Sequence, residues 1–120
     1  MKKLVDRYDS YFDDIVELYD ITTEKTTLRA AVTTYGAYDE NHEETTGIGA
    51  TVEIIGNNCN DDNIIQAIYD TLKDDYEETG IDYTTDYNSY INTRLYATFT
   101  TYGSPSDIDD ILEVAEKLAS

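Results

Sequence analysis

Carboxylates are the reactive groups that this sequence offers in quantity. It contains 26 Asp and Glu residues, but only one histidine, His42, and one cysteine, Cys59. Paired carboxylates perform acid and base catalysis in glycoside hydrolases, and clusters of them bind hard metal ions such as calcium. Both kinds of site depend on distances in the folded chain, so the abundance of carboxylates does not by itself indicate either one.

The histidine and the cysteine lack the neighbours that catalysis requires. His42 lies in an acidic segment, residues 39–45, which we expect to be a loop, whereas a general base needs a scaffold that orients it. Cys59 follows two asparagines at the start of an expected helix, with no second cysteine and no nearby histidine in the sequence. We interpret His42 as a solvated loop residue and Cys59 as a structural or incidental thiol.

Sequence motifs of common enzyme and cofactor families are absent. The chain has no phosphate-binding loop, no dinucleotide fingerprint and no nucleophile elbow. The run Asp107-Ile108-Asp109-Asp110 has the close spacing of a calcium loop but lacks its glycine and terminal glutamate, so we interpret it as charge at a helix N-terminus. We expect no catalytic residue, no metal site and no cofactor, and therefore a protein that is not an enzyme.

The net charge restricts the partners of this chain. Its 120 residues are enough for a single domain, residues 1–120, and 8 Lys and Arg against 26 Asp and Glu give a net charge of −18. Direct nucleic-acid binding needs a basic surface, and anionic membranes attract basic proteins, so both partners are disfavoured. Solubility alone requires a net charge of only about 2–8. We expect a basic protein partner, with adaptation to high salt as the alternative.

Three helices and about four strands are expected to position these groups. Residues 2–20 have the apolar spacing of an amphipathic helix, and residues 61–78 and the segment after Ser104-Pro105 have the same spacing. Residues 26–38, 47–55, 81–85 and 90–102 alternate or are β-branched as strands are. The order α-ββ-α-ββ-α predicts an α+β fold, in which helices cover one face of an antiparallel sheet.

The outer sides of the expected helices carry lines of carboxylates. Residues three or four apart are neighbours on a helix, so such a line presents roughly one charge per 5.4 Å turn. Duplex DNA presents about one phosphate per 1.7 Å of its axis. We predict that two or three lines imitate part of a DNA backbone, although the outer helix faces of any acidic protein are acidic. The predicted partner-binding residues are Asp6, Asp9, Asp13, Glu17 and Asp20 in the first helix, and Asp70, Asp74, Glu77 and Glu78 in the second.

In size, charge and mixed α+β layout, the chain resembles small acidic inhibitors of phages and mobile elements. The lines Asp6–Asp20 and Asp62–Glu78 and the acidic segment 39–44 carry this resemblance. Such anti-CRISPR and anti-restriction proteins include many DNA mimics. The resemblance implies a non-enzymatic inhibitor that occupies the basic nucleic-acid groove of a host defence nuclease or effector. The alternative in the same class is an immunity protein against a basic nuclease toxin.

The expected cellular location is the cytoplasm, which would be the host cytoplasm for a phage-encoded protein. No apolar run approaches the roughly 18 residues that a membrane span requires. The N-terminus has two lysines but no apolar stretch of the kind that follows them in a signal peptide.

A second candidate surface lies on one face of the expected strands. Two of the three arginines fall there, together with part of an unusual set of 12 tyrosines. Arginine forks and aromatic rings bind anionic groups, so this face is predicted to sequester a small anionic nucleotide. Tyrosine-rich sheet surfaces also suit dimerisation, and pairing with Glu53 is a further alternative. The residues of this face are Arg29, Tyr35, Arg94, Tyr96 and Tyr102.

Salt is predicted to stabilise the isolated protein. A net charge of −18 destabilises the compact state by self-repulsion. The Debye length falls from about 30 Å at 0.01 M to about 8 Å at 0.15 M ionic strength, so added salt screens this repulsion. The melting temperature, followed by circular dichroism, is expected to rise over this range. A melting temperature that falls as salt is added would contradict the prediction.

Overall fold

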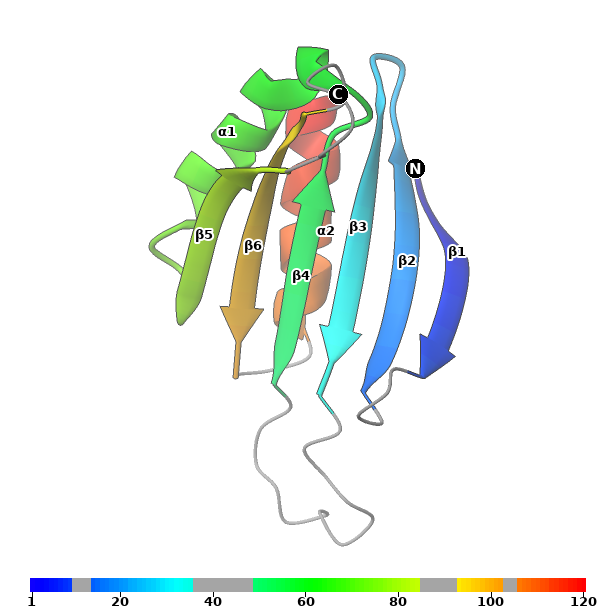
Figure 1. The fold of residues 1–120 in the computed structure, drawn as a ribbon, viewed down its shortest axis with the longest axis vertical. Helices are drawn as coiled ribbons and strands as arrows, with labels where there is room; N and C mark the ends of the chain where they lie inside the picture. The colour runs from blue at the N-terminus through cyan, green and yellow to red at the C-terminus, as the bar shows by residue number, and fades with distance from the viewer. Residues whose placement is uncertain (10–13, 36–48, 85–92, 103–105) are drawn as a thin grey trace, which may run out of the picture.

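The computed structural model describes residues 1–9, 14–35, 49–84, 93–102 and 106–120 (Figure 1). Its strands form one antiparallel sheet in the order β1-β2-β3-β4-β6-β5. The elements in chain order are β1 (Lys2–Asp9), β2 (Ile15–Thr22), β3 (Thr27–Thr34), β4 (Ala50–Ile55), the 3₁₀ turn η2 (Cys59–Asp61), α1 (Asp62–Leu72), β5 (Glu78–Tyr83), β6 (Leu95–Thr101) and α2 (Ser106–Ala119).

Both α-helices cover the same face of the sheet, as Figure 1 shows, and the hydrophobic core lies between them and the strands. Alternate residues of the central strands point into this core, as the period of two in a strand requires. The predicted α+β class and the covering of one sheet face by helices are confirmed. The core includes Leu28, Ala30, Val32, Val52, Ile54, Ala97 and Phe99 from the sheet, and Ile65, Ile68, Leu72, Ile111, Leu112 and Ala115 from the helices.

The predicted helix over residues 2–20 is wrong, because its two ends are the strands β1 and β2, which pair with each other. The apolar residues fit helical spacing across the whole segment, but the second half, IVELYDIT, is also rich in β-branched and aromatic residues, as strands are. β2 pairs along its whole length with β3. Ile21, which lies just beyond the predicted helix, is part of β2 and is fully buried. Pairing with β3 and the high β-propensity of Val, Ile and Tyr outweigh the helical spacing.

The hairpin separates the carboxylates that a helix would have aligned. Residues that pair directly across antiparallel strands share a face of the sheet. Asp20 pairs with Arg29 and Asp6 pairs with Leu18, and both pairs lie on the sheet face without helices. Asp9 and Glu17 lie on the other face, on the helix side. Asp13, the remaining member of the predicted line, is outside the described residues.

Within the described residues the sheet has six strands rather than about four, and two α-helices accompany it rather than three. α1 ends at Leu72, well before the predicted end at residue 78. Thr79 and Gly80, which follow the predicted end of that helix, belong to β5 and pair with Phe99 and Thr98 of β6. Tyr76, beyond the helix, still packs on the core, with its ring centroid 6.1 Å from that of Phe99.

The central predictions for the remaining elements are confirmed within the described residues. β3, β4 and β6 lie inside the predicted strands, with the predicted faces toward the core. In α2 the predicted stripe is buried at Ile111, Leu112 and Ala115, but Leu118 is exposed and Ala119 takes the buried position. The acidic segment 39–45 with His42 and the predicted turn at 86–89 lie outside the described residues. No helix in the described part of the chain is long and apolar enough to cross a membrane.

A buried carboxylate fixes the corner between β4 and α1. Asp61 is 5% exposed, and its Oδ2 accepts hydrogen bonds from the backbone N of Asn57 at 2.8 Å and from Thr26 Oγ1 at 3.0 Å. Asn58 caps the start of η2, because its side chain accepts a hydrogen bond from the backbone N of Asn60. In return, Asp61 Oδ2 accepts a hydrogen bond from the backbone N of Asn58. A Cβ on Gly56 would lie 2.6 Å from Asp61 Cβ, so this corner requires glycine there. The corner therefore ties the β2–β3 turn to the entry of α1.

Replacing Asp61 is predicted to destabilise the fold strongly. Asp61→Ala leaves the backbone N of Asn57 and the Thr26 hydroxyl without their acceptor, which costs about 2–4 kcal/mol for buried donors. Asp70→Ala is the matched control, because Asp70 is exposed and accepts one hydrogen bond from Gln66, and its loss is expected to cost under about 0.5 kcal/mol. Urea denaturation measures both; equal losses would show that the corner is not held by Asp61.

Candidate functional site

The helix side of the molecule carries a group of carboxylates that we call the acidic surface. They come from the last turns of α1, the connection to β5, and the exposed side of α2. Lys73 and Lys117 are the only basic residues within residues 62–83 and 106–119. The acidic surface consists of Asp70, Asp74, Asp75, Glu77, Asp110 and Glu113, all of which are exposed.

Tyr76 shows that the two acidic segments lie close together. Burial raises the pKa of Tyr76, and the nearby carboxylates of Asp107, Asp110 and Asp75 raise it further. Two of these carboxylates belong to α2 and one to the connection after α1. The acids of α2 and of the α1–β5 connection therefore act on the same region, although about 35 residues of sequence separate them.

Ion pairs in the described residues involve carboxylates outside the acidic surface. Arg7 Nε lies 3.8 Å from Glu17, and Lys2 Nζ lies 3.6 Å from Asp109. Two further pairs join Arg29 to Asp20 and the N-terminal amine to Glu116. No ion pair joins a member of the acidic surface to another described residue. These four basic groups thus neutralise acids of β2 and α2, and none of them pairs with the acidic surface.

The predicted partner-binding residues are therefore only partly brought together. Asp70, Asp74 and Glu77 belong to the acidic surface, whereas Glu78 begins β5 and pairs with Thr100. Asp110 and Glu113 lie on the outer side of α2, but they were not among the predicted partner-binding residues. The helical period of the α2 sequence is the signal that could have shown that they are exposed.

The opposite face of the sheet, which we call the open face, has a different chemistry. Arg29, Ile55 and Tyr96 lie side by side across β3, β4 and β6. A Cβ on Gly49 would lie 3.1 Å from the Tyr35 ring and 3.3 Å from the Tyr102 ring, so both rings pass over this glycine. The structure thus places the predicted arginines and tyrosines on one face.

A row of hydroxyl groups crosses the open face beside these rings. The Tyr35 hydroxyl is hydrogen-bonded to Thr51 Oγ1, which lies 3.0 Å from Thr100 Oγ1. This row joins the end of β3 to β4 and β6. It satisfies hydroxyls that would otherwise need water, and it fixes Tyr35 in place. Tyr102, by contrast, is 54% exposed and its ring remains available.

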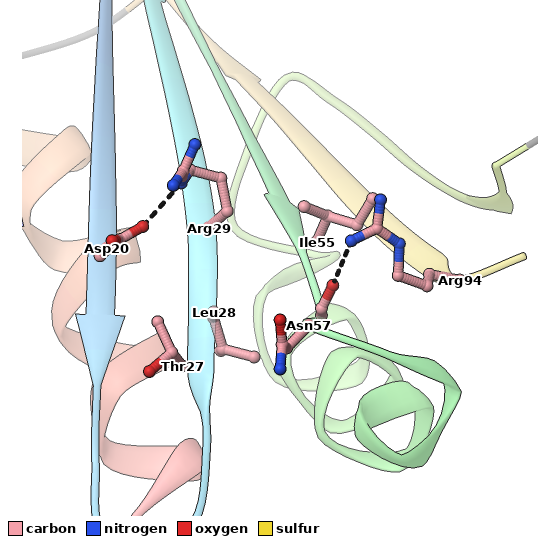
Figure 2. Close-up of a pocket in the computed structure, with 8 residues that line it drawn as sticks. Asp20, Thr27, Leu28, Arg29, Ile55, Asn57 and Arg94 are labelled. Carbon is pink, nitrogen blue, oxygen red and sulfur yellow. Dashed lines mark hydrogen bonds and ion pairs between the residues drawn. The ribbon is translucent and has the colours of Figure 1, made fainter. Parts of the chain in front are cut away.

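Two arginines lie at one end of the open face, around a hollow of about 410 Å³ that we call the arginine hollow (Figure 2). Arg29 Nε donates to Asp20 Oδ1 at 2.6 Å, and Arg94 Nη1 donates to the carbonyl oxygen of Gly56 at 3.2 Å. The hollow is lined by Asp20, Thr27, Leu28, Arg29, Ile55, Gly56, Asn57 and Arg94.

Metal and thiol chemistry find little support in the described residues. No group of three or more His, Cys, Asp and Glu side chains in that part of the chain is arranged to hold a metal ion. Asp107, from the run with calcium-loop spacing, instead accepts a hydrogen bond from Thr101 Oγ1 at 2.7 Å. Cys59 is a free, exposed thiol in η2.

Comparison with family models, with curated proteins and with solved structures finds no match to this chain.

Tyr76 is predicted to report the field of the acidic surface. Its folded pKa is raised above its ordinary value, so its contribution to stability is fully present below pH 10 and is lost as the pH rises through the folded pKa. Asp110→Asn removes one carboxylate that raises this pKa and should lower it. The midpoint for Tyr76 is measured as the difference between alkaline absorbance titrations of each protein with and without Tyr76→Phe.

Glu113→Gln is the matched control for Asp110→Asn. It removes the same charge from the same helix, but Glu113 is not among the groups that raise the pKa of Tyr76. We expect a smaller shift than for Asp110→Asn. Equal shifts in the two variants would mean that Tyr76 senses only the total charge of the protein.

Proposed function

We propose that the protein is a non-enzymatic inhibitor that binds the basic, nucleic-acid-binding groove of another protein through the acidic surface. One observation carries this proposal: the carboxylates of the acidic surface have no ion pair within the described residues, while Lys2, Arg7, Arg29 and the N-terminal amine pair with other carboxylates. A protein with few bases that leaves one side uncompensated presents a strong negative field on that side.

Asp70, Asp110 and Glu113 of the acidic surface lie on helices that the core holds firmly. Ile68 of α1 and Ile111 and Ala115 of α2 are fully buried against the sheet. Side chains on such helices lose less freedom on binding than side chains on mobile loops, which favours affinity. A preorganised array of carboxylates thus supports competition with phosphate groups for a basic groove.

The proposed partner is a nuclease or effector of a host defence system, as the resemblance to anti-CRISPR and anti-restriction inhibitors implies. A basic nuclease toxin is the alternative partner, because its groove has the same charge. In either case the inhibitor and nucleic acid compete for one site. Binding should therefore weaken steeply as salt is raised, since complementary surface charges are screened.

Reversing charges of the acidic surface is predicted to weaken this binding, chiefly by slowing association. Asp74, Asp110 and Glu113 are exposed, so changing all three to lysine should preserve the fold. The lost steering should slow association with the partner by at least about tenfold at low salt, with a smaller effect on dissociation. The partner is first captured on the immobilised protein from a lysate at low salt after nucleic acid is removed, then purified for kinetic measurements.

A matched triple variant controls for total charge. Asp6, Glu53 and Asp82 are exposed residues of the sheet, and changing them to lysine alters the net charge equally. This variant should keep most of its association rate, and the wild-type protein should block DNA binding by the purified partner. Equal slowing by both triple variants, or a partner that binds DNA normally in the complex, would refute the proposal.

A further inference from the structure

The arginine hollow lies where β4 ends and the chain turns toward α1. Arg29 borders it from β3, and Arg94 borders it from the residue before β6, so the end of β4 lies between the two residues. Figure 2 shows the Arg29 guanidinium turned toward Asp20 and the Arg94 guanidinium beside the end of β4. Neighbouring strands are about 4.8 Å apart, and β3 and β6 are two intervals apart, so the backbones that carry the two arginines are on the order of 10 Å apart. Both long side chains border the same space.

Arg94 has a hydrogen-bond donor that the protein leaves unused. Its Nε is the only buried side-chain nitrogen or oxygen within the described ranges that has no hydrogen-bond partner. Nη1 of the same guanidinium is held by the Gly56 carbonyl, so the group is fixed in orientation. Buried polar groups in native proteins are nearly always satisfied, and an exception calls for an explanation such as an ion or ligand.

Arg29 is occupied by a partner that a ligand can replace. Its Nε donates to Asp20, and the arginine side chain is 49% exposed. Exposed ion pairs of this kind contribute little to stability, so exchanging a carboxylate for another anion costs little. Asp20 is the only acidic residue that lines the hollow, against two arginines. The hollow is therefore locally positive in a protein of net charge −18.

We propose that the arginine hollow binds a small ligand of the diphosphate class, with its anionic groups held between Arg29 and Arg94. Guanidinium groups fork onto phosphate oxygens, and two of them on opposite sides match a ligand with two adjacent phosphoryl groups better than a single phosphate. Thr27 and Asn57 also line the hollow and bring polar side chains to the same space. This site lies on the open face and does not depend on the acidic surface.

The test is calorimetric titration of the full chain with pyrophosphate, with inorganic phosphate and ADP as comparison probes at constant ionic strength. Pyrophosphate should bind more tightly than inorganic phosphate. Arg29→Ala and Arg94→Ala should each weaken pyrophosphate binding about tenfold or more, as expected for loss of charge-assisted hydrogen bonds. Asp20→Asn should tighten it severalfold, because it removes the competing carboxylate and frees Arg29.

Arg7→Ala is the matched control, because it removes the same charge from an arginine that pairs with Glu17 on the helix side. It should leave pyrophosphate binding unchanged. Tighter binding of ADP than of pyrophosphate would identify the ligand as a nucleotide, and equal binding would identify a free diphosphate. The proposal is overturned if wild-type protein shows no binding of pyrophosphate, or if Arg7→Ala weakens binding as much as Arg29→Ala.

The Asp20→Asn and Arg29→Ala variants keep the test decisive if Arg94→Ala does not fold. Both residues are outside the hydrophobic core, and unchanged circular dichroism spectra would confirm that these two variants are folded. Opposite effects of the two substitutions on pyrophosphate affinity would place the ligand at Arg29. Two folded variants that bind as the wild type does would remove Arg29 from the site and refute the proposal.

Discussion

Burial of one sheet face alone is the constraint on which the rest of this structure depends. The core lies between the strands and two helices, so apolar side chains are concentrated on that face. The outer sides of the helices can then be polar, and they include the exposed carboxylates of Asp70, Asp110 and Glu113. The other sheet face has no helix over it within the described residues, and it is covered by its own tyrosine and threonine hydroxyls and by arginine. One burial pattern thus produces two surfaces of different chemistry.

The parts of the fold that sequence could predict are those in which one periodicity fits. In β3 and β4 the buried residues are apolar and recur at every second position, and in α2 the buried residues recur with the helical period, so these elements were identified correctly. Residues 2–20 have helical apolar spacing and also residues of high β-propensity. Whether they form a helix or strands depends on which segment pairs with β3. β3 has β2 as a neighbour along its whole length, and this long-range pairing is a property of the folded chain that no local spacing records.

The face on which a candidate site residue lies could be predicted where the helix or strand that carries it was identified correctly. The side of the sheet on which Arg29 and Tyr96 lie follows from strand parity, and the exposure of Asp110 and Glu113 follows from the helical period. The pairing of Asp20 with Arg29 depends on the register between β2 and β3, which the sequence did not reveal. The arginine hollow depends on where β4 ends, and that point is set by Gly56 and by the buried carboxylate of Asp61.

The two surfaces are electrostatically separate although they belong to one small domain. A helix with its side chains is about 10 Å across, so the outer carboxylates of α1 and α2 lie farther than that from the open face. The Debye length at physiological salt is about 8 Å, which screens a solvent-exposed anion at the arginine hollow from most of the acidic surface. An anionic ligand and a basic protein partner can therefore bind opposite faces with little mutual interference. The corner at Asp61 joins the two sides, because it connects the start of α1 to the end of β4 and to the Gly56 carbonyl that holds Arg94. A second connection is the hydrogen bond that Asp62 Oδ1 accepts from the backbone N of Leu95, the residue after Arg94.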